Sequence, residues 1–252
     1  MTAAPSPSPG MSNRELALVL GSVGAALVAS GLRVRFRYRE GRPSWRLRLF
    51  THGAPLAGAV AAMLWKRRDP REYGFTPNGW RPSLAAAPVR VAPALLLAAL
   101  AWTSRPGPSA ARVDRMARML ADMPLHEMAP YHGLVALGEE ALFRGCVQRE
   151  LAGRDLPTVR LGPLCADGPV AASAALFGLF HLVNLTLRPV PATLGQVAFA
   201  TVFGMNLGAL VRRHGTLAGP VVIHLLSNVL SMLALKRHLQ FAGSGESPPP
   251  RG

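Results

Sequence analysis

Apolar blocks, most of them about as long as a membrane-spanning helix and separated by arginine-rich connectors, dominate this sequence. A bilayer core about 30 Å thick requires about 20 apolar residues per helix, and every backbone polar group inside it must be paired within the protein. Half of the 252 residues are hydrophobic, and the mean hydropathy is +0.23. The pattern therefore predicts an all-α, polytopic transmembrane helical bundle with about 6–7 spans.

The blocks divide the chain into a sequence of expected segments. The apolar blocks lie at Leu16–Leu32, His52–Trp65, Ser83–Trp102, 129–148, 167–187, 191–211 and 216–235. Between the third and fourth blocks, Arg112, Arg115 and Arg118 recur among apolar residues, which predicts an interfacial amphipathic helix within 103–128. The expected units are a disordered tail (1–13), N-terminal membrane segments with basic connectors (14–128), a helical core (129–237) and a second disordered tail (238–252).

The excess of basic residues points to a partner. The formal net charge is +15, and seven arginines lie in the connector from Arg33 to Arg48, beside apolar blocks. This placement favours anionic membrane lipids over nucleic acid as the partner. The two cysteines, Cys146 and Cys165, exclude a disulfide framework. Membrane orientation and oligomeric state stay open.

Ionisable side chains occur inside three of the last four apolar blocks, where burial in lipid is costly and usually reflects function. The first of these blocks contains GEEALFRG, with Glu139, Glu140 and Arg144. Glu140 and Arg144 are four residues apart, so they can pair along one helix face. Glu139 is turned away from Glu140 by about 100° and remains available to another helix.

The other two blocks carry histidines. Phe177 lies four residues before His181 in ALFGLFHLVN, where Asn184 follows one turn later, and His224 lies four residues before Asn228 in GPVVIHLLSNVL. At this spacing Phe177 can wedge the first imidazole, and the last two side chains point into the same space. A carboxylate, two imidazoles and a carboxamide that converge between helices could activate a water and polarise a carbonyl.

Each of these groups alone also has a structural explanation. Glu140 and Arg144 could form an ion pair without catalytic role, a single histidine could be an interhelix hydrogen-bonding contact, and Asn228 could join helices. What favours a site is that three separate segments each carry a polar group that can only face inward.

A second histidine motif fits metal binding poorly. His126 and His132 in HEMAPYH resemble H-E-x-x-H, but they are six residues apart, which places them on different helix faces, and Pro130 interrupts the segment. The sequence has no G-x-S-x-G motif for serine catalysis.

The three motifs together resemble those of the CPBP family, the CAAX-processing and bacteriocin-processing membrane proteins, also called the Abi or type II CAAX endopeptidase family. The similar segments read EEALFRG, SAALFGLFH and FGMNLGALVRRHGTLAGPVVIHLLSN, and the connector REYGFTPNGW (71–80) is similar to the family's polar loop. The resemblance covers about 134–235 and hardly touches the first 130 residues. Each motif alone is weak, whereas their order on successive apolar helices is specific.

The resemblance implies an intramembrane endopeptidase with defined roles for its motif residues. Glu139 and His181 would activate the water, while His224 and Asn228 would hold the oxyanion or a metal. The supporting residues would be Glu140, Arg144 and Phe177. The family is described both as glutamate-type and as metalloprotease, so a zinc ion held by His181 and His224 stays open, and asparagine is an uncommon zinc ligand.

The function expected from this resemblance is hydrolysis of a peptide bond in a membrane-associated protein or peptide, near its C-terminus. Prenylated proteins, processed peptides and bacterial proteins with C-terminal sorting signals are the candidate substrates. The alternative is a non-proteolytic membrane scaffold or immunity protein of the same family. The expected location is a multi-pass position in the membrane, and the Arg, Ala and Pro usage favours a bacterial one.

Overall fold

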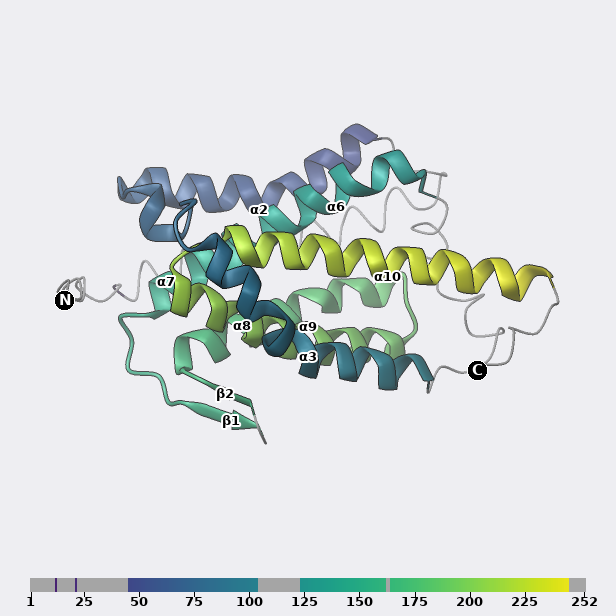
Figure 1. Cartoon of the computed structure of the whole chain (residues 1–252). Coiled ribbons are helices and arrows are strands. Elements are labelled where there is room, and N and C mark those ends of the chain that lie inside the picture. Colours follow the sequence, from purple (N-terminus) through teal and green to yellow (C-terminus); the bar gives the residue numbers. More distant parts are fainter. Residues whose placement is uncertain (1–11, 13–20, 22–44, 104–122, 162–163, 245–252) are drawn as a thin grey trace.

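The computed structural model describes residues 12, 21, 45–103, 123–161 and 164–244. These residues form a bundle of helices with one short hairpin (Figure 1). The helices are α2 (Trp45–Lys66), α3 (Trp80–Thr103), α6 (Leu125–Glu140), α7 (Gln148–Leu151), α8 (Gly168–Phe180), α9 (Val190–His214) and α10 (Ala218–Ser244). The 3₁₀ segments are η1 (Pro70–Tyr73) and η3 (His181–Thr186), the π-helix is η2 (Ala141–Val147), and the strands are β1 (Val159–Leu161) and β2 (Leu164–Ala166).

Three helical segments of the described chain are long and apolar enough to cross a membrane: Gly168–Leu185, Val190–His214 and Ala218–Arg237. Large apolar side chains on all three stay exposed in the bundle, among them Leu179, Leu194 and Leu226, as expected for surfaces that face lipid. The helical membrane fold is therefore confirmed, while the expected total of 6–7 spans stays a prediction.

Several boundaries differ from those expected. Apart from residue 21, the block Leu16–Leu32 lies outside the described residues, as does most of the interfacial helix. Residues 125–128 form the first turn of α6. α2 begins at Trp45, so the end of the basic connector up to Arg48 is helical. α10 continues to Ser244, so residues 238–244, which were expected in the disordered tail, are helical, because Leu, Gln and Ala there favour a helix. The antiparallel hairpin, in which Val159 pairs with Ala166, was not expected.

Local signals explain how the motif helices start and stop. The Asp167 carboxylate accepts a hydrogen bond from Val170 N at 3.0 Å and caps α8, with Pro169 in the first turn. α9 ends at His214 and is capped by Gly215, whose φ of 68° is left-handed and whose N–H donates to Val211 O at 2.8 Å. These two turns orient the apolar helices that carry the histidine motifs.

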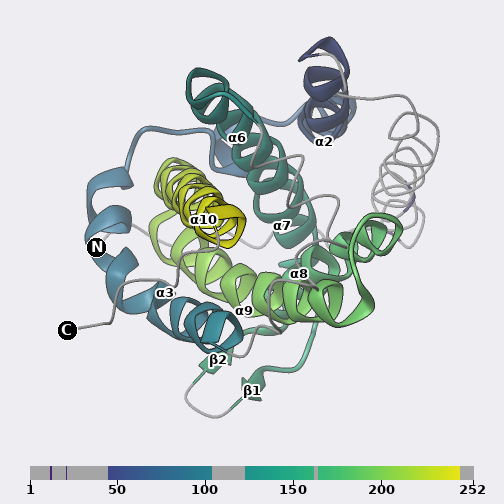
Figure 2. The same cartoon turned by 90° about the vertical axis from the view of Figure 1, so that its right-hand side faces the viewer.

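Seen down its length, the bundle surrounds α10 with α6, α9 and α3 (Figure 2). α8 packs on α9, and a Cβ at Gly178 would lie 2.0 Å from Thr201 Oγ1 and 2.9 Å from Val197 O. Glycine therefore permits the close approach of these two helices, which is typical of packing in membranes.

The connector between α2 and α3 is fixed to the start of α10. Leu217 N donates to Gly74 O at 2.9 Å, and Thr216 Oγ1 donates to Thr76 O at 2.6 Å. Gly74 has a φ of 82°, a conformation that side chains disfavour. The polar loop thus closes over the turn from which α10 begins.

Candidate active site

The two neighbouring carboxylates end α6, directly before the π-helix η2. π-helical segments are rare and often occur at functional sites. Arg144, within η2, lies with its Nη1 3.1 Å from Glu140 Oε1, and the two side chains are 1% and 0% exposed. The pair expected from helical spacing is therefore present, although the intervening backbone is not α-helical.

Glu140 is shared between two partners. Its Oε1 also lies 2.8 Å from His224 Nδ1 on α10. Glu139 Oε2 lies 3.7 Å from His224 Nε2, which is longer than a hydrogen bond. Glu139 thus faces a histidine as expected, but the shorter contact belongs to Glu140, a link between helices that the sequence did not reveal.

His181 stands at the junction of α8 and η3, where its Nδ1 lies 2.9 Å from Phe177 O. A carbonyl only accepts, so this nitrogen carries the hydrogen and a neutral ring leaves the Nε2 lone pair free. The rings of Phe177 and His181 meet edge to face with centroids 5.0 Å apart. Phe177 therefore fixes the imidazole through both its ring and its backbone.

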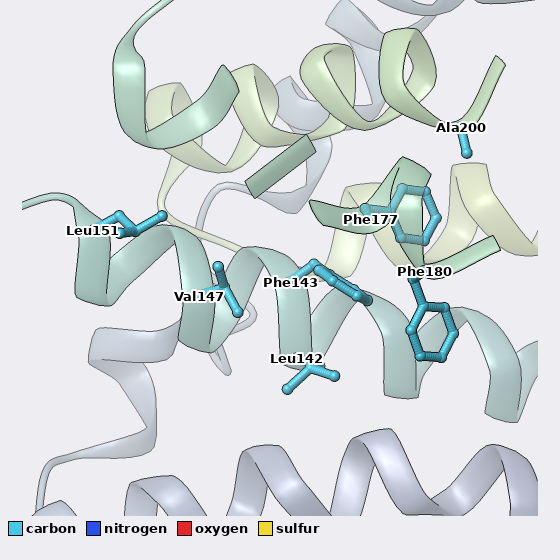
Figure 3. Packing of buried hydrophobic residues seen from close by; sticks show 7 residues of the cluster. All are labelled: Leu142, Phe143, Val147, Leu151, Phe177, Phe180 and Ala200. Atoms are coloured by element: carbon cyan, nitrogen blue, oxygen red, sulfur yellow. The ribbon is translucent and has the colours of Figure 1, made fainter. Parts of the chain in front are cut away.

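Phe177 is the centre around which the site packs. Arg144 Cζ lies 4.2 Å from its ring centroid, and the His224 ring lies edge to face at 5.9 Å. The same ring packs on Phe143 at 5.2 Å, within the apolar cluster that also contains Phe180 (Figure 3). The two histidines of separate helices therefore contact one common phenyl ring.

The two asparagines of the motifs differ in their surroundings. Asn184 Nδ2 donates to Gln196 Oε1 at 2.9 Å, which also accepts from Arg188 at 2.9 Å. Asn228 lies one turn beyond His224 on α10, is half-buried, and has no hydrogen-bond partner among the described residues. Its carboxamide is available to a ligand, whereas that of Asn184 is occupied.

Two further residues belong to these surroundings. The Phe203 ring of α9 contacts His224 edge to face at 5.6 Å. His132 of α6 is 5% exposed, and its Nε2 has no hydrogen-bond partner. In the sequence, His132 stood out only as part of an H-E-x-x-H-like motif. Its position seven residues before Glu139, which places both side chains on one helix face, could have linked it to the site.

The donor chemistry of the site suits zinc. A metal-binding histidine usually donates its other ring N–H to a carbonyl or carboxylate, which is the arrangement of His181 on Phe177 O and of His224 on Glu140. Within the described ranges, however, no three His, Cys, Asp or Glu side chains are grouped so that they could hold a metal ion. The two histidines therefore have the partners that zinc ligands use, whereas the described residues do not bring three ligands together.

The segment with these contacts also carries a family signature. Residues 123–230 match the family model described as type II CAAX prenyl endopeptidase Rce1-like. Over this segment the chain is similar to the Rce1-like family. The match confirms the resemblance inferred from the motifs, and the Rce1-like segment contains every expected site residue. No curated protein and no solved structure is significantly similar to the chain.

Proposed function

We propose that this chain is an intramembrane endopeptidase that hydrolyses a peptide bond of a membrane-associated protein or peptide, near the substrate's C-terminus. The observation that carries the proposal is the meeting of Glu139 and Glu140 with His224, across two helices, at a buried position. Paired carboxylates and an imidazole can transfer protons, and the similarity of residues 123–230 to the Rce1-like endopeptidase family supports the proposal.

In this proposal Glu139 and His181 activate the attacking water. Glu139 accepts the water proton, while the free Nε2 of His181 orients the same water towards the carbonyl carbon. The proton then passes from Glu139 to the leaving nitrogen as the peptide bond breaks. A glutamate in this role must be free to exchange its proton, and Glu139 is the carboxylate that Arg144 does not hold.

His224 and Asn228 hold the oxyanion. The Glu140 carboxylate, anchored by Arg144, accepts from His224 Nδ1 and sets the ring orientation. When Nε2 also carries a hydrogen, it can donate to the negative oxygen, together with the unpartnered amide of Asn228. Glu140, Arg144 and the ring of Phe177 thus support the site without touching the reacting atoms.

A zinc ion is compatible with the same residues. His181 and His224 would hold it, and it would polarise the scissile carbonyl and supply hydroxide at neutral pH. The proposed partners are membrane lipids and a membrane-anchored protein or peptide substrate. The proposed location is the bacterial cell membrane, which the chain crosses several times. Prenylated proteins, processed peptides and proteins with C-terminal sorting signals remain the candidate substrates.

One substitution tests the proposal against the scaffold alternative. Glu139→Gln keeps size and hydrogen bonding but removes the base, so cleavage of a co-expressed substrate should fall by about a hundred- to ten-thousand-fold. Membrane yield should stay at the wild-type level, because the change also removes a buried charge. Glu127→Gln, at the other end of α6, is the matched control and should cleave normally.

Two outcomes would change the proposal. If Glu139→Gln retains full cellular function, the hydrolytic mechanism is wrong and the scaffold or immunity role takes its place. A chelator applied to purified wild type separates the two catalytic types. If the chelator abolishes cleavage and added zinc restores it, the protein is a metalloprotease, whereas unchanged cleavage indicates a glutamate-type protease.

A further inference from the structure

His132 is a buried polar residue without a use in the site as described. It is 5% exposed, and its Nε2 has no hydrogen-bond partner. Leaving a buried polar atom unpaired is costly, so native structures rarely keep one without a reason such as a bound ligand or a functional role. Its neighbour Tyr131 meets the imidazole edge to face at 4.9 Å, which fixes the ring without satisfying the nitrogen.

His132 lies on the same side of α6 as the catalytic carboxylate. Seven residues correspond to about 700°, only about 20° short of two full turns, and to about 10 Å along the helix axis. The imidazole therefore extends the polar surface of the site along α6, towards the N-terminal end of this helix.

The packing of α6 against α10 places a second polar side chain between the carboxylates and His132. The helices run antiparallel, because His224 contacts Glu140 while Lys236 Nζ donates to Met123 O at the other end. From the contact between His224 and Glu140, Asn228 lies about 6 Å along α10 and His132 about 12 Å along α6 in the same direction, so Asn228 falls between the level of the carboxylates and that of His132. Two polar groups without hydrogen-bond partners, a carboxamide and the imidazole Nε2, thus follow the carboxylates in turn along the same helix pair.

We propose that His132 is a substrate-binding residue, whose Nε2 forms a hydrogen bond to the substrate backbone about three residues from the scissile bond. The proposal rests on the proposed function. An extended peptide spans about 3.3–3.6 Å per residue, so the offset of about 10 Å along α6 corresponds to about three residues. A neutral imidazole suits a backbone carbonyl or amide, because both satisfy it without burying a further charge.

The test compares His132→Leu with His132→Gln, which retains a hydrogen-bonding side chain. His126→Leu, an exposed position on the same helix, is the control. With the peptide that wild type cleaves fastest, His132→Leu should raise KM about three- to tenfold and leave kcat nearly unchanged. The hydrogen bond to the substrate backbone is present in both the bound substrate and the transition state, so its loss weakens both equally. His132→Gln should recover part of the loss. Thermal stability in detergent should not fall, because Nε2 has no protein partner to lose.

Truncated peptides give the test its spatial resolution. Wild type should bind a peptide less well when the third residue on one side of the scissile bond is removed, whereas His132→Leu should bind both peptides alike. Equal KM values for wild type and His132→Leu with all peptides would overturn the proposal. A parallel fall in stability and cleavage, not recovered by His132→Gln, would also overturn it and make His132 a packing residue.

A binding measurement separates this inference from the proposed function. Fluorescence anisotropy of a fluorescein-labelled peptide gives its Kd for detergent-solubilised protein in the Glu139→Gln background. If wild type cleaves nothing but His132→Leu still weakens binding about three- to tenfold, the proposed hydrolysis fails and the subsite stands. An unchanged Kd refutes the subsite, whatever the outcome of the cleavage assay.

Discussion

Gly204 on α9 is the position at which one added methyl group should disturb the site most directly. A Cβ there would lie 2.8 Å from Arg144 Nη2, 3.2 Å from Phe177 Cδ1 and 3.3 Å from Ala174 Cα. Arg144 cannot retreat into solvent, because its side chain is 1% exposed and paired with Glu140. The structure therefore predicts that Gly204→Ala destabilises the protein and displaces the guanidinium that anchors Glu140.

The same helix provides a matched control. Gly195→Ala adds a Cβ with nothing within 4 Å. Both variants gain the same helix propensity, so the difference between them isolates the overpacking cost, about 1–3 kcal/mol. For a chain of this size, each kcal/mol of destabilisation lowers Tm by about 2–4 °C.

The assay is thermal unfolding of both variants and wild type in one detergent, with cleavage of a co-expressed substrate measured in parallel. Gly204→Ala should melt below Gly195→Ala and lose most of its cleavage, while Gly195→Ala should retain both properties. Equal melting temperatures for the two variants would refute the packing described around Arg144. A stable Gly204→Ala with full cleavage would show that the Arg144 position does not matter for the site.

Two further substitutions test charged contacts of the bundle. Arg144→Ala leaves the Glu140 carboxylate buried without its cation, so it should lower the free energy of unfolding by about 3–5 kcal/mol and reduce membrane yield. Arg213→Ala, at an exposed position, is the control and should keep the wild-type yield. Equal yields for the two variants would contradict the buried ion pair. Tyr73→Phe removes the 3.0 Å hydrogen bond to Glu150 and should cost about 1–3 kcal/mol in thermal unfolding. Burial, and then the Glu150 charge, raise the pKa of Tyr73 above its ordinary value of 10.0. The unfolded chain thus loses this proton first, and wild type should lose stability as pH rises above 10.0 while Tyr73→Phe loses less.

The sequence was sufficient to predict the helices that carry the motifs, because polar residues inside apolar blocks can be buried only if they face the interior of a helical bundle. The Glu140–Arg144 pair and the contact between Phe177 and His181 both follow from a spacing of four residues, which places side chains on one helix face. The link from Glu140 to His224 could not be predicted in this way. It depends on how two helices 84 residues apart rotate against each other, and no local spacing encodes that rotation.

Other features could not be predicted from the sequence, because no local pattern of residues indicates them. The π-helix Ala141–Val147 has no marker in composition, since its residues also suit an α-helix. The hairpin that contains Cys165 consists of two three-residue strands, which are too short for an apolar pattern to identify them. Boundaries such as Trp45 moved because residues beside an apolar block continue a helix when packing allows it.

The docking of the polar connector on the turn before α10 has a consequence for any shortened form of the protein. The Rce1-like match begins at residue 123, yet the backbone of Leu217, inside the match, is held by Gly74, far outside it. The Tyr73 hydroxyl and Lys66 bind Glu150 in the same way. The region defined by sequence similarity is therefore not an autonomous folding unit: a fragment that starts at residue 123 would lose the groups that hold α10, and with it His224, in place.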